Sequence, residues 1–151
     1  MKLSTKGRYG ARAMLDLALH YTEEGGPVSL GAIAHRQGIS EEYLEQIFSA
    51  LRKAGLVESI RGAQGGYKPG RPAEKITVGD ILRVLEGSLS PVDCADDGKT
   101  PSCDRYDECV MRDVWRKMRD SINAAVDSVT LADLVAKYET LQHKGDYMYY
   151  I

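Results

Sequence analysis

The sequence has no run of about 20 apolar residues, which is the length that a membrane-spanning helix requires. Positive charge occurs in Met1–Arg8, but no apolar stretch follows it, so we expect no signal peptide. The 3 cysteines among 151 residues cannot all pair within one chain. We therefore expect a cytoplasmic protein with no membrane partner. There thiols stay reduced, and cysteines are more often buried, catalytic or metal-binding than disulfide-bonded.

Motifs typical of enzymes are also missing. His20, His35 and His143 are scattered along the chain without the spacing of a metal or catalytic pair. The glycine-rich stretch 62–66 falls in an expected hairpin rather than between a strand and a helix, so it is not a phosphate-binding loop. With no nucleophile–base pair and no paired carboxylates, we expect no enzymatic activity.

The net charge of −2 argues at first against a nucleic-acid partner. The charges are unevenly placed, however. Residues 1–75 contain 11 basic and 8 acidic side chains, whereas residues 76–151 contain 9 basic and 14 acidic ones. This asymmetry indicates a polyanion-facing first half and a second half with a different role.

The first half has the pattern of a winged helix-turn-helix. Apolar spacing predicts a helix over 5–21, and Ser29 and Ser40 stand where helix N-caps belong. Two short capped helices separated by a glycine predict a helix-turn-helix over about 29–54. The alternating stretch that follows predicts a β-hairpin, the wing, over about 56–68. We expect a mostly α fold with a small β-hairpin, in which residues 1–75 form one domain.

The second half, 76–151, is expected to be helical around a loop that contains every cysteine. We expect a helix capped by Thr77 and Asp80, the cysteine loop over 88–109, a long amphipathic helix over 109–129, a last short helix capped by Thr130 and Asp133, and a C-terminal tail ending in residues 147–151. On the long helix, Trp115 and Met118 lie at helical spacing, and we interpret them as interface core rather than as a cofactor pocket.

Four stretches resemble the Rrf2-type winged-helix regulators of bacteria, and the resemblance covers most of the chain. It implies a homodimer that binds double-stranded operator DNA through two winged helices, with the long helices crossing at the dimer interface. The matching stretches are residues 3–9, 43–46, 51–57 and 60–67.

The exposed face of the helix after Ser40 carries polar side chains that suit base recognition. Glutamine can pair with adenine through two hydrogen bonds, and a carboxylate can accept a hydrogen bond from cytosine. The resemblance assigns Ser40, Tyr43, Glu45 and Gln46 to the major groove and Arg61 in the wing to the minor groove. Glu42 stands where the iron–sulfur members of the family have serine, which points to a different operator preference. The alternative is that these side chains only form the solvated face of an amphipathic helix. The candidate DNA-binding residues are Ser40, Glu42, Tyr43, Glu45, Gln46 and Arg61.

The three cysteines, Cys94, Cys103 and Cys109, fall within one short loop. Clustered thiols in an irregular loop of a reduced protein favour a soft metal centre. A zinc site would need four ligands, and no second close Cys or His pair supplies them. The resemblance implies that the three thiols hold a 2Fe–2S cluster. Inert or simply redox-active cysteines are the alternative.

The fourth cluster ligand is not identified by the sequence. Arg112 stands where the iron–sulfur members place a histidine, and Arg8 stands where other members place an aspartate. The spacing between Cys94 and Cys103 is also longer than is usual in those members. The remaining candidates are Asp107, Glu108, Asp113 or a small thiol.

The tail resembles the C-terminus of cysteine-metabolism regulators in the same family. Capture of a terminal carboxylate is a recurrent mode of peptide recognition, so Ile151 is a candidate plug for the active site of cysteine synthase. Packing of the tail against the dimer is the alternative. The sequence thus predicts a regulator controlled by an iron–sulfur cluster that senses iron–sulfur, iron or redox status, or else one controlled by cysteine synthase. An adaptor with a degenerate winged helix, lacking salt-dependent DNA binding, is a third class.

Overall fold

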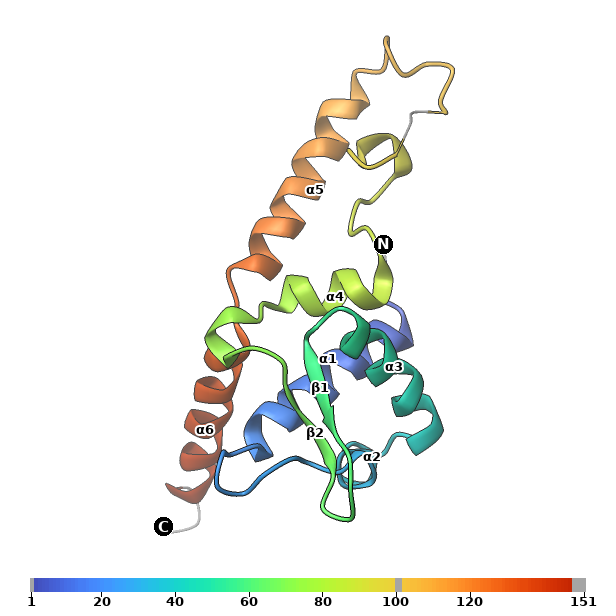
Figure 1. Cartoon of the computed structure of the whole chain (residues 1–151). Helices are drawn as coiled ribbons and strands as arrows, with labels where there is room; N and C mark the ends of the chain where they lie inside the picture. The colour runs from blue at the N-terminus through green and yellow to red at the C-terminus, as the bar shows by residue number, and fades with distance from the viewer. Residues whose placement is uncertain (1, 100–101, 148–151) are drawn as a thin grey trace.

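A computed structural model of the chain describes residues 2–99 and 102–147. The described residues confirm a mostly helical fold with a single two-stranded antiparallel hairpin (Figure 1). In chain order the helices and strands are α1 (Thr5–His20), α2 (Leu30–Gln37), α3 (Glu41–Lys53), β1 (Val57–Ile60), β2 (Gly66–Pro69), α4 (Val78–Glu86), α5 (Met111–Asp127) and α6 (Leu131–Tyr147). None of the described helices is long and apolar enough to cross a membrane.

The helix-turn-helix is formed by α2 and α3, and both expected N-caps are confirmed. The hydroxyl of Ser29 accepts a hydrogen bond from the Ala32 N–H, and that of Ser40 accepts one from the Tyr43 N–H. Between the helices Gly38 has φ +63°, a left-handed conformation that glycine adopts without the penalty of a Cβ atom. These local signals alone place the second helix of the motif.

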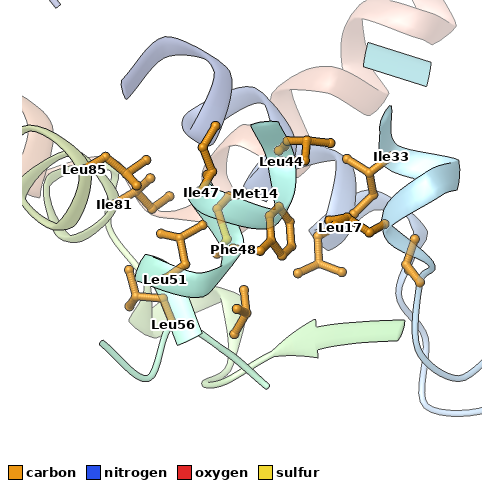
Figure 2. Close-up of a cluster of buried hydrophobic side chains, with 14 of the residues drawn as sticks. Met14, Leu17, Ile33, Leu44, Ile47, Phe48, Leu51, Leu56, Ile81 and Leu85 are labelled. Carbon is orange, nitrogen blue, oxygen red and sulfur yellow. The ribbon is translucent and has the colours of Figure 1, made fainter. Parts of the chain in front are cut away.

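The core lies between α1, α2 and α3 and extends to Ile81 and Leu85 of α4. Figure 2 shows Phe48 near its centre, beside Met14. The apolar spacing of α1, with Ala11, Met14, Leu15, Ala18 and Leu19, predicts its buried face only in part. Met14 is buried and the other four are half-buried, whereas Ala13, Leu17 and two glycines outside that set are buried. The reason is close packing against α4. A Cβ atom on Gly10 would overlap the side chain of Leu85, so glycine at this position allows the two helices to approach.

The wing is held against the turn before α2. Val28 and Tyr67 exchange two backbone hydrogen bonds, each 2.8 Å from N to O. The Tyr67 ring also packs edge-on against Phe48 of α3, with ring centroids 4.8 Å apart. The hairpin is therefore attached to both the turn and the second helix of the motif.

The second half contacts the first through α4 and α6, which both pack on α1. The capping boxes at Thr77 and Thr130 are confirmed, since each hydroxyl accepts from the N–H three residues on and each N–H is bound by that aspartate. The expectation of a short last helix is wrong, because α6 spans 17 residues. The side chain of Leu131, in its first turn, is fully buried. Packing of α6 against α1 stabilises further turns after the capped first turn, which explains the greater length.

Candidate nucleic-acid interface and cysteine loop

The candidate reading surface is the solvent-facing side of α3. Leu44, Ile47, Phe48 and Leu51 are buried and fix the orientation of this helix. Glu42, Glu45 and Gln46 are exposed, so their side chains are accessible to a partner. At the N-terminus of α3 the Ser40 oxygen serves as the cap, while its O–H remains available as a donor.

Tyr43 differs from its neighbours because it is half-buried. Its ring meets the edge of Tyr9 from α1, with centroids 6.1 Å apart and an angle of 81° between the planes. The guanidinium of Arg12 lies 5.6 Å from the centroid of Tyr9 and donates to the carbonyl oxygen of Gln37 at 2.8 Å. The position of Tyr43 is thus set by α1.

The second part of the candidate surface is the tip of the wing. Arg61 is exposed directly after β1 and precedes Gly62, whose φ of +117° allows the tight turn. Between α3 and the wing lies an open hollow of about 450 Å³, lined by Glu45 and Arg52 from α3 and by Ile60 from β1, among others. The hollow brings α3 and the wing together on one surface.

Two residues of this hollow were not anticipated from the sequence. Arg52 lies seven residues after Glu45, which places both on one face of the helix. The seven-residue spacing, about two helical turns, is visible in the sequence and indicates that Arg52 shares the exposed face of Glu45. Ile60 exposes 41% of its surface on β1, and only the register of the hairpin shows that it faces this hollow.

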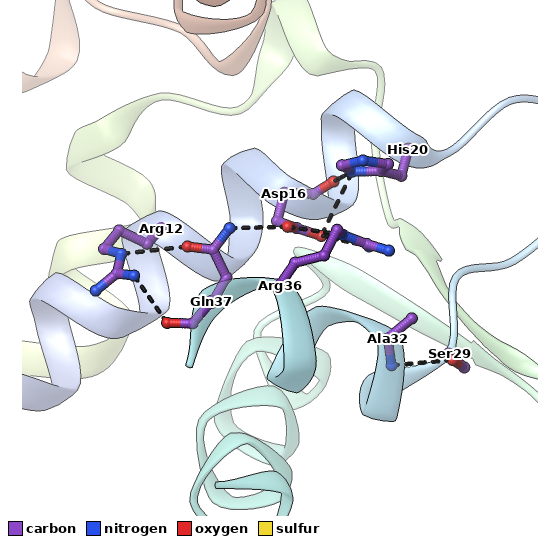
Figure 3. Close-up of polar contacts among 7 residues, drawn as sticks. All are labelled: Arg12, Asp16, His20, Ser29, Ala32, Arg36 and Gln37. Carbon is purple, nitrogen blue, oxygen red and sulfur yellow. Dashed lines mark hydrogen bonds and ion pairs between the residues drawn. The ribbon is translucent and has the colours of Figure 1, made fainter. Parts of the chain in front are cut away.

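A buried carboxylate joins α1 to the helix-turn-helix (Figure 3). Asp16 is 2% exposed and accepts hydrogen bonds from Arg36 and from Gln37 Nε2, the latter at 2.8 Å. The hydrogen bond to Asp16 raises the pKa of Arg36. This pair was not predicted from the sequence. The position of Asp16 between two leucines on α1 is the one local pattern that indicates its burial.

The cysteine loop lies beside α5. Cys94 is half-buried in the short turn Asp93–Ala95, Cys103 is exposed, and Cys109 is half-buried just before α5. Among residues 2–99 and 102–147, no three Cys, His, Asp or Glu side chains lie close enough to hold one metal ion. The thiols suit a soft metal centre in chemical type, but the described structure does not bring them together as a ligand set.

The described structure identifies no fourth ligand, either at Arg112 and Arg8, where other family members place one, or among the candidate carboxylates. Arg112 donates to the carbonyl oxygen of Tyr106 at 2.8 Å, and its guanidinium lies 4.3 Å from the centroid of that ring. Asp107, Glu108 and Asp113 are exposed. Arg8, an exposed cation on α1, cannot bind iron.

Helix α5 presents an apolar surface to solvent. None of its residues is buried, and Met111, Val114 and Met118 expose 44%, 46% and 42% of their surface. Val114, Met118 and Ile122 line a mostly apolar hollow of about 310 Å³. Contiguous exposed apolar side chains of this kind mark an interaction surface.

Residues 3–137 match a protein family described as "Rrf2: Iron-dependent Transcriptional regulator". The chain is 48% identical, over the full length of both proteins, to the HTH-type transcriptional regulator CymR of Bacillus subtilis. It is 43% identical to the HTH-type transcriptional regulator IscR of Escherichia coli, over 96% of this chain and 86% of that one.

Solved structures give the same two kinds of relative. The structure of T. potens IscR is 51% identical, covers 99% of this chain and 97% of that one, and has a TM-score of 0.76. The structure of CymR (YrzC), the global cysteine regulator of B. subtilis, is 46% identical, covers 91% of this chain and 98% of that one, and has a TM-score of 0.73. The fold is therefore that of winged-helix transcriptional regulators.

Proposed function

Because the chain belongs to the Rrf2 family of transcriptional regulators, we propose that it binds operator DNA as a homodimer through α3 and the wing. The observation that carries this proposal is the open hollow between α3 and the wing, to which both contribute polar side chains. Residues 1–75 would form the DNA-reading domain, and residues 76–151 the sensor and dimerisation domain. The relatives named above are transcriptional regulators rather than enzymes.

The chemistry of the exposed side chains suggests how the operator is read. Gln46 is assigned to an adenine, Glu45 and Glu42 to cytosine amino groups, and Tyr43 and Ser40 to neighbouring positions of the major groove. Arg61 is assigned to the minor groove, where a narrow A·T-rich segment attracts a guanidinium. In a dimer the two half-sites would lie one or two helical turns apart, at roughly 34 Å per turn.

The Arg61→Ala variant tests the DNA-binding surface. Its probe is a duplex that the unmodified protein selects from a random-sequence library. We expect operator affinity to fall more than about tenfold, since one groove contact is worth roughly 1–3 kcal/mol. A matched control is Arg71→Ala, which removes an exposed arginine beyond β2. Equal affinities of the Arg61→Ala variant and the unmodified protein at moderate salt would contradict the assignment.

For the sensor, we propose a 2Fe–2S cluster bound by Cys94, Cys103 and Cys109 that controls operator binding. The family description contains the words "Iron-dependent", and two relatives are IscR proteins. A bound cluster would supply a centre sensitive to oxidation and to iron supply. Since the thiols are not assembled in the described structure, the loop would have to rearrange to bind it.

Anaerobic purification tests this sensor, with visible absorption and assays of iron and sulfide. We expect a coloured protein with iron and sulfide in equal amounts, and an operator affinity that changes when the cluster is removed. A protein that remains colourless and iron-free after reconstitution would contradict the cluster proposal.

A second candidate is a regulator of cysteine metabolism that is controlled by cysteine synthase through Ile151. It is supported by the 48% identity with CymR over the whole length of both chains. Ile151 lies outside the described residues. Deletion of residues 149–151 is expected to abolish cysteine synthase binding in calorimetry. Identical isotherms for the full and shortened chains, or no binding by either, would remove this candidate.

A further inference from the structure

One arginine of α5 holds the segment that carries the first cysteine. The Nη1 atom of Arg119 donates to the carbonyl oxygen of Ala95 at 2.5 Å and lies 2.8 Å from Asp97 Oδ1. Its Nη2 atom lies 2.9 Å from Asp120 Oδ1 of the same helix. The Arg119 side chain is 15% exposed, whereas those of Asp97 and Asp120 are 82% and 66% exposed. The two ion pairs therefore lie at the surface, and the hydrogen bond to Ala95, a buried residue, is the more protected contact.

The segment that Arg119 contacts also has internal polar contacts and one buried residue. Ala95, the neighbour of Cys94, is 1% exposed. On either side of it, Lys99 Nζ lies 2.5 Å from Asp93 Oδ1, and the Gly98 N–H donates to the Asp96 carboxylate at 3.1 Å. Cys94 therefore belongs to a short segment that is pinned to α5 at Ala95 and Asp97.

The contacts of Arg119 with Ala95 and Asp97 lie well away from the end of the loop that contains Cys109. Arg119 follows Met111, the first residue of α5, by eight positions, or roughly 12 Å at a rise of 1.5 Å per residue. Cys109 precedes α5, so it lies beyond that end of the helix. Figure 1 shows the yellow turn at residues 93–95 beside α5, whereas the orange segment that leads into α5 extends past its N-terminal end. Thiolates that share one cluster must instead meet around it, since a metal–sulfur bond is only about 2.3 Å long.

We propose that Arg119 is a latch that fixes the Cys94 segment on α5, and that the latch must open before the three thiols bind one iron–sulfur centre. The second clause rests on the cluster proposed above, whereas the first does not. Arg119 is a positioning residue: it acts on Cys94 through Ala95 and Asp97 and binds no metal itself.

The latch is tested in the full-length, reduced and metal-free protein by the alkylation rate of each cysteine with N-ethylmaleimide, read by peptide mass spectrometry. In the Arg119→Gln variant we expect Cys94 to react at least fivefold faster. Cys103, which is exposed in the same loop, is the internal reference and is expected to keep its rate. The Lys137→Gln variant removes one positive charge from an exposed position of α6, away from this loop, and is expected to leave both rates unchanged.

A second variant guards against loss of folding. Asp97→Asn weakens the grip on one side, leaves the bond to Ala95 in place and is expected to raise the Cys94 rate by a smaller factor. If Arg119→Gln loses helical circular dichroism, this variant carries the measurement. Unchanged Cys94 alkylation in the folded variants would overturn the latch.

Reconstitution with ferrous iron and sulfide tests the second clause. We expect the visible absorption of Arg119→Gln to rise at least twofold faster than that of the unmodified protein. Equal or slower rates, combined with faster Cys94 alkylation, would overturn the requirement for opening. If neither protein takes up iron, the cluster proposal and the opening step fall together, and the alkylation result still decides the latch.

Discussion

The guanidinium of Arg36 binds both carboxylate oxygens of Asp16, with Nη2 2.6 Å from Oδ1 and Nε 3.0 Å from Oδ2. In the part of the chain that the structure describes, Asp16 is the only charged residue that is buried. The pair links the middle of α1 to the end of α2. The helix-turn-helix is therefore held on α1 by a directional polar contact as well as by apolar packing.

Removal of the Asp16 carboxylate is expected to destabilise the protein. In Asp16→Ala, Arg36 and Gln37 lose their common acceptor, and the free energy of unfolding should fall by about 2–3 kcal/mol, the scale of a lost hydrogen bond to a charged group. Asp16→Asn keeps an acceptor and should lose less. Urea denaturation measures both, with the exposed Glu24→Ala as control. An Asp16→Ala midpoint equal to that of the control would contradict the importance of this pair.

The contact between the wing and the turn before α2 depends on a missing Cβ atom. A Cβ atom on Gly66 would clash with the backbone of Val28, whereas one on Gly98 would meet only an ordinary contact 3.5 Å away. We expect Gly66→Ala to cost about 1–3 kcal/mol, as overpacking does. Gly98→Ala should stay within about 0.5 kcal/mol. Thermal or urea unfolding of the two variants checks the difference, and equal stabilities would disprove the close approach.

The apolar surface of α5 is proposed to be the dimer interface. A charge introduced there would have to be buried without a partner, so Met118→Glu is expected to weaken dimerisation at least about tenfold. The control is Lys137→Glu, a charge change at an exposed position of α6. Sedimentation equilibrium over a range of concentrations measures both. A Met118→Glu protein that dimerises as tightly as the control would place the interface elsewhere.

The cap of α6 is expected to make stability depend on pH. Hydrogen bonds from the Thr130 N–H and hydroxyl lower the pKa of Asp133. Because the folded pKa lies below the unfolded value of about 3.9, the carboxylate stabilises the protein above that pH, and this contribution is lost as the pH falls through the lowered pKa.

The stability difference between the unmodified protein and Asp133→Asn should therefore shrink between about pH 6 and pH 3. Chemical denaturation at each pH measures it. Glu139→Gln, an exposed carboxyl on the same helix, is the control. A difference that stays constant over this range would show that the charge of Asp133 does not stabilise the cap.

Local signals account for most of what could be predicted. The caps at Ser29, Ser40 and Thr77 each involve groups only three residues apart, so short-range sequence patterns identify them. Short-range patterns do not predict the length of α6. It depends on packing against α1, which is far away in the sequence.

In the candidate site, too, the features that depend on local patterns could be predicted and those that depend on long-range contacts could not. The exposed face of α3 follows from helical periodicity, and Arg61 follows from the hairpin turn. The burial of Asp16, the seat of Tyr67 against Val28 and the contact of Arg119 with Ala95 all join segments separated by 20 or more residues. No local pattern encodes such pairings.

Short-range patterns predict the winged helix-turn-helix, its caps and the placement of all three cysteines in one loop, because capping hydrogen bonds and apolar periodicity act over a few residues. Long-range packing sets the buried face of α1 and leaves α5 with an exposed apolar surface, and within residues 2–99 and 102–147 it brings no three metal-ligating side chains together. Those outcomes depend on how helices distant in sequence pack and on which polar groups they bring within hydrogen-bonding distance.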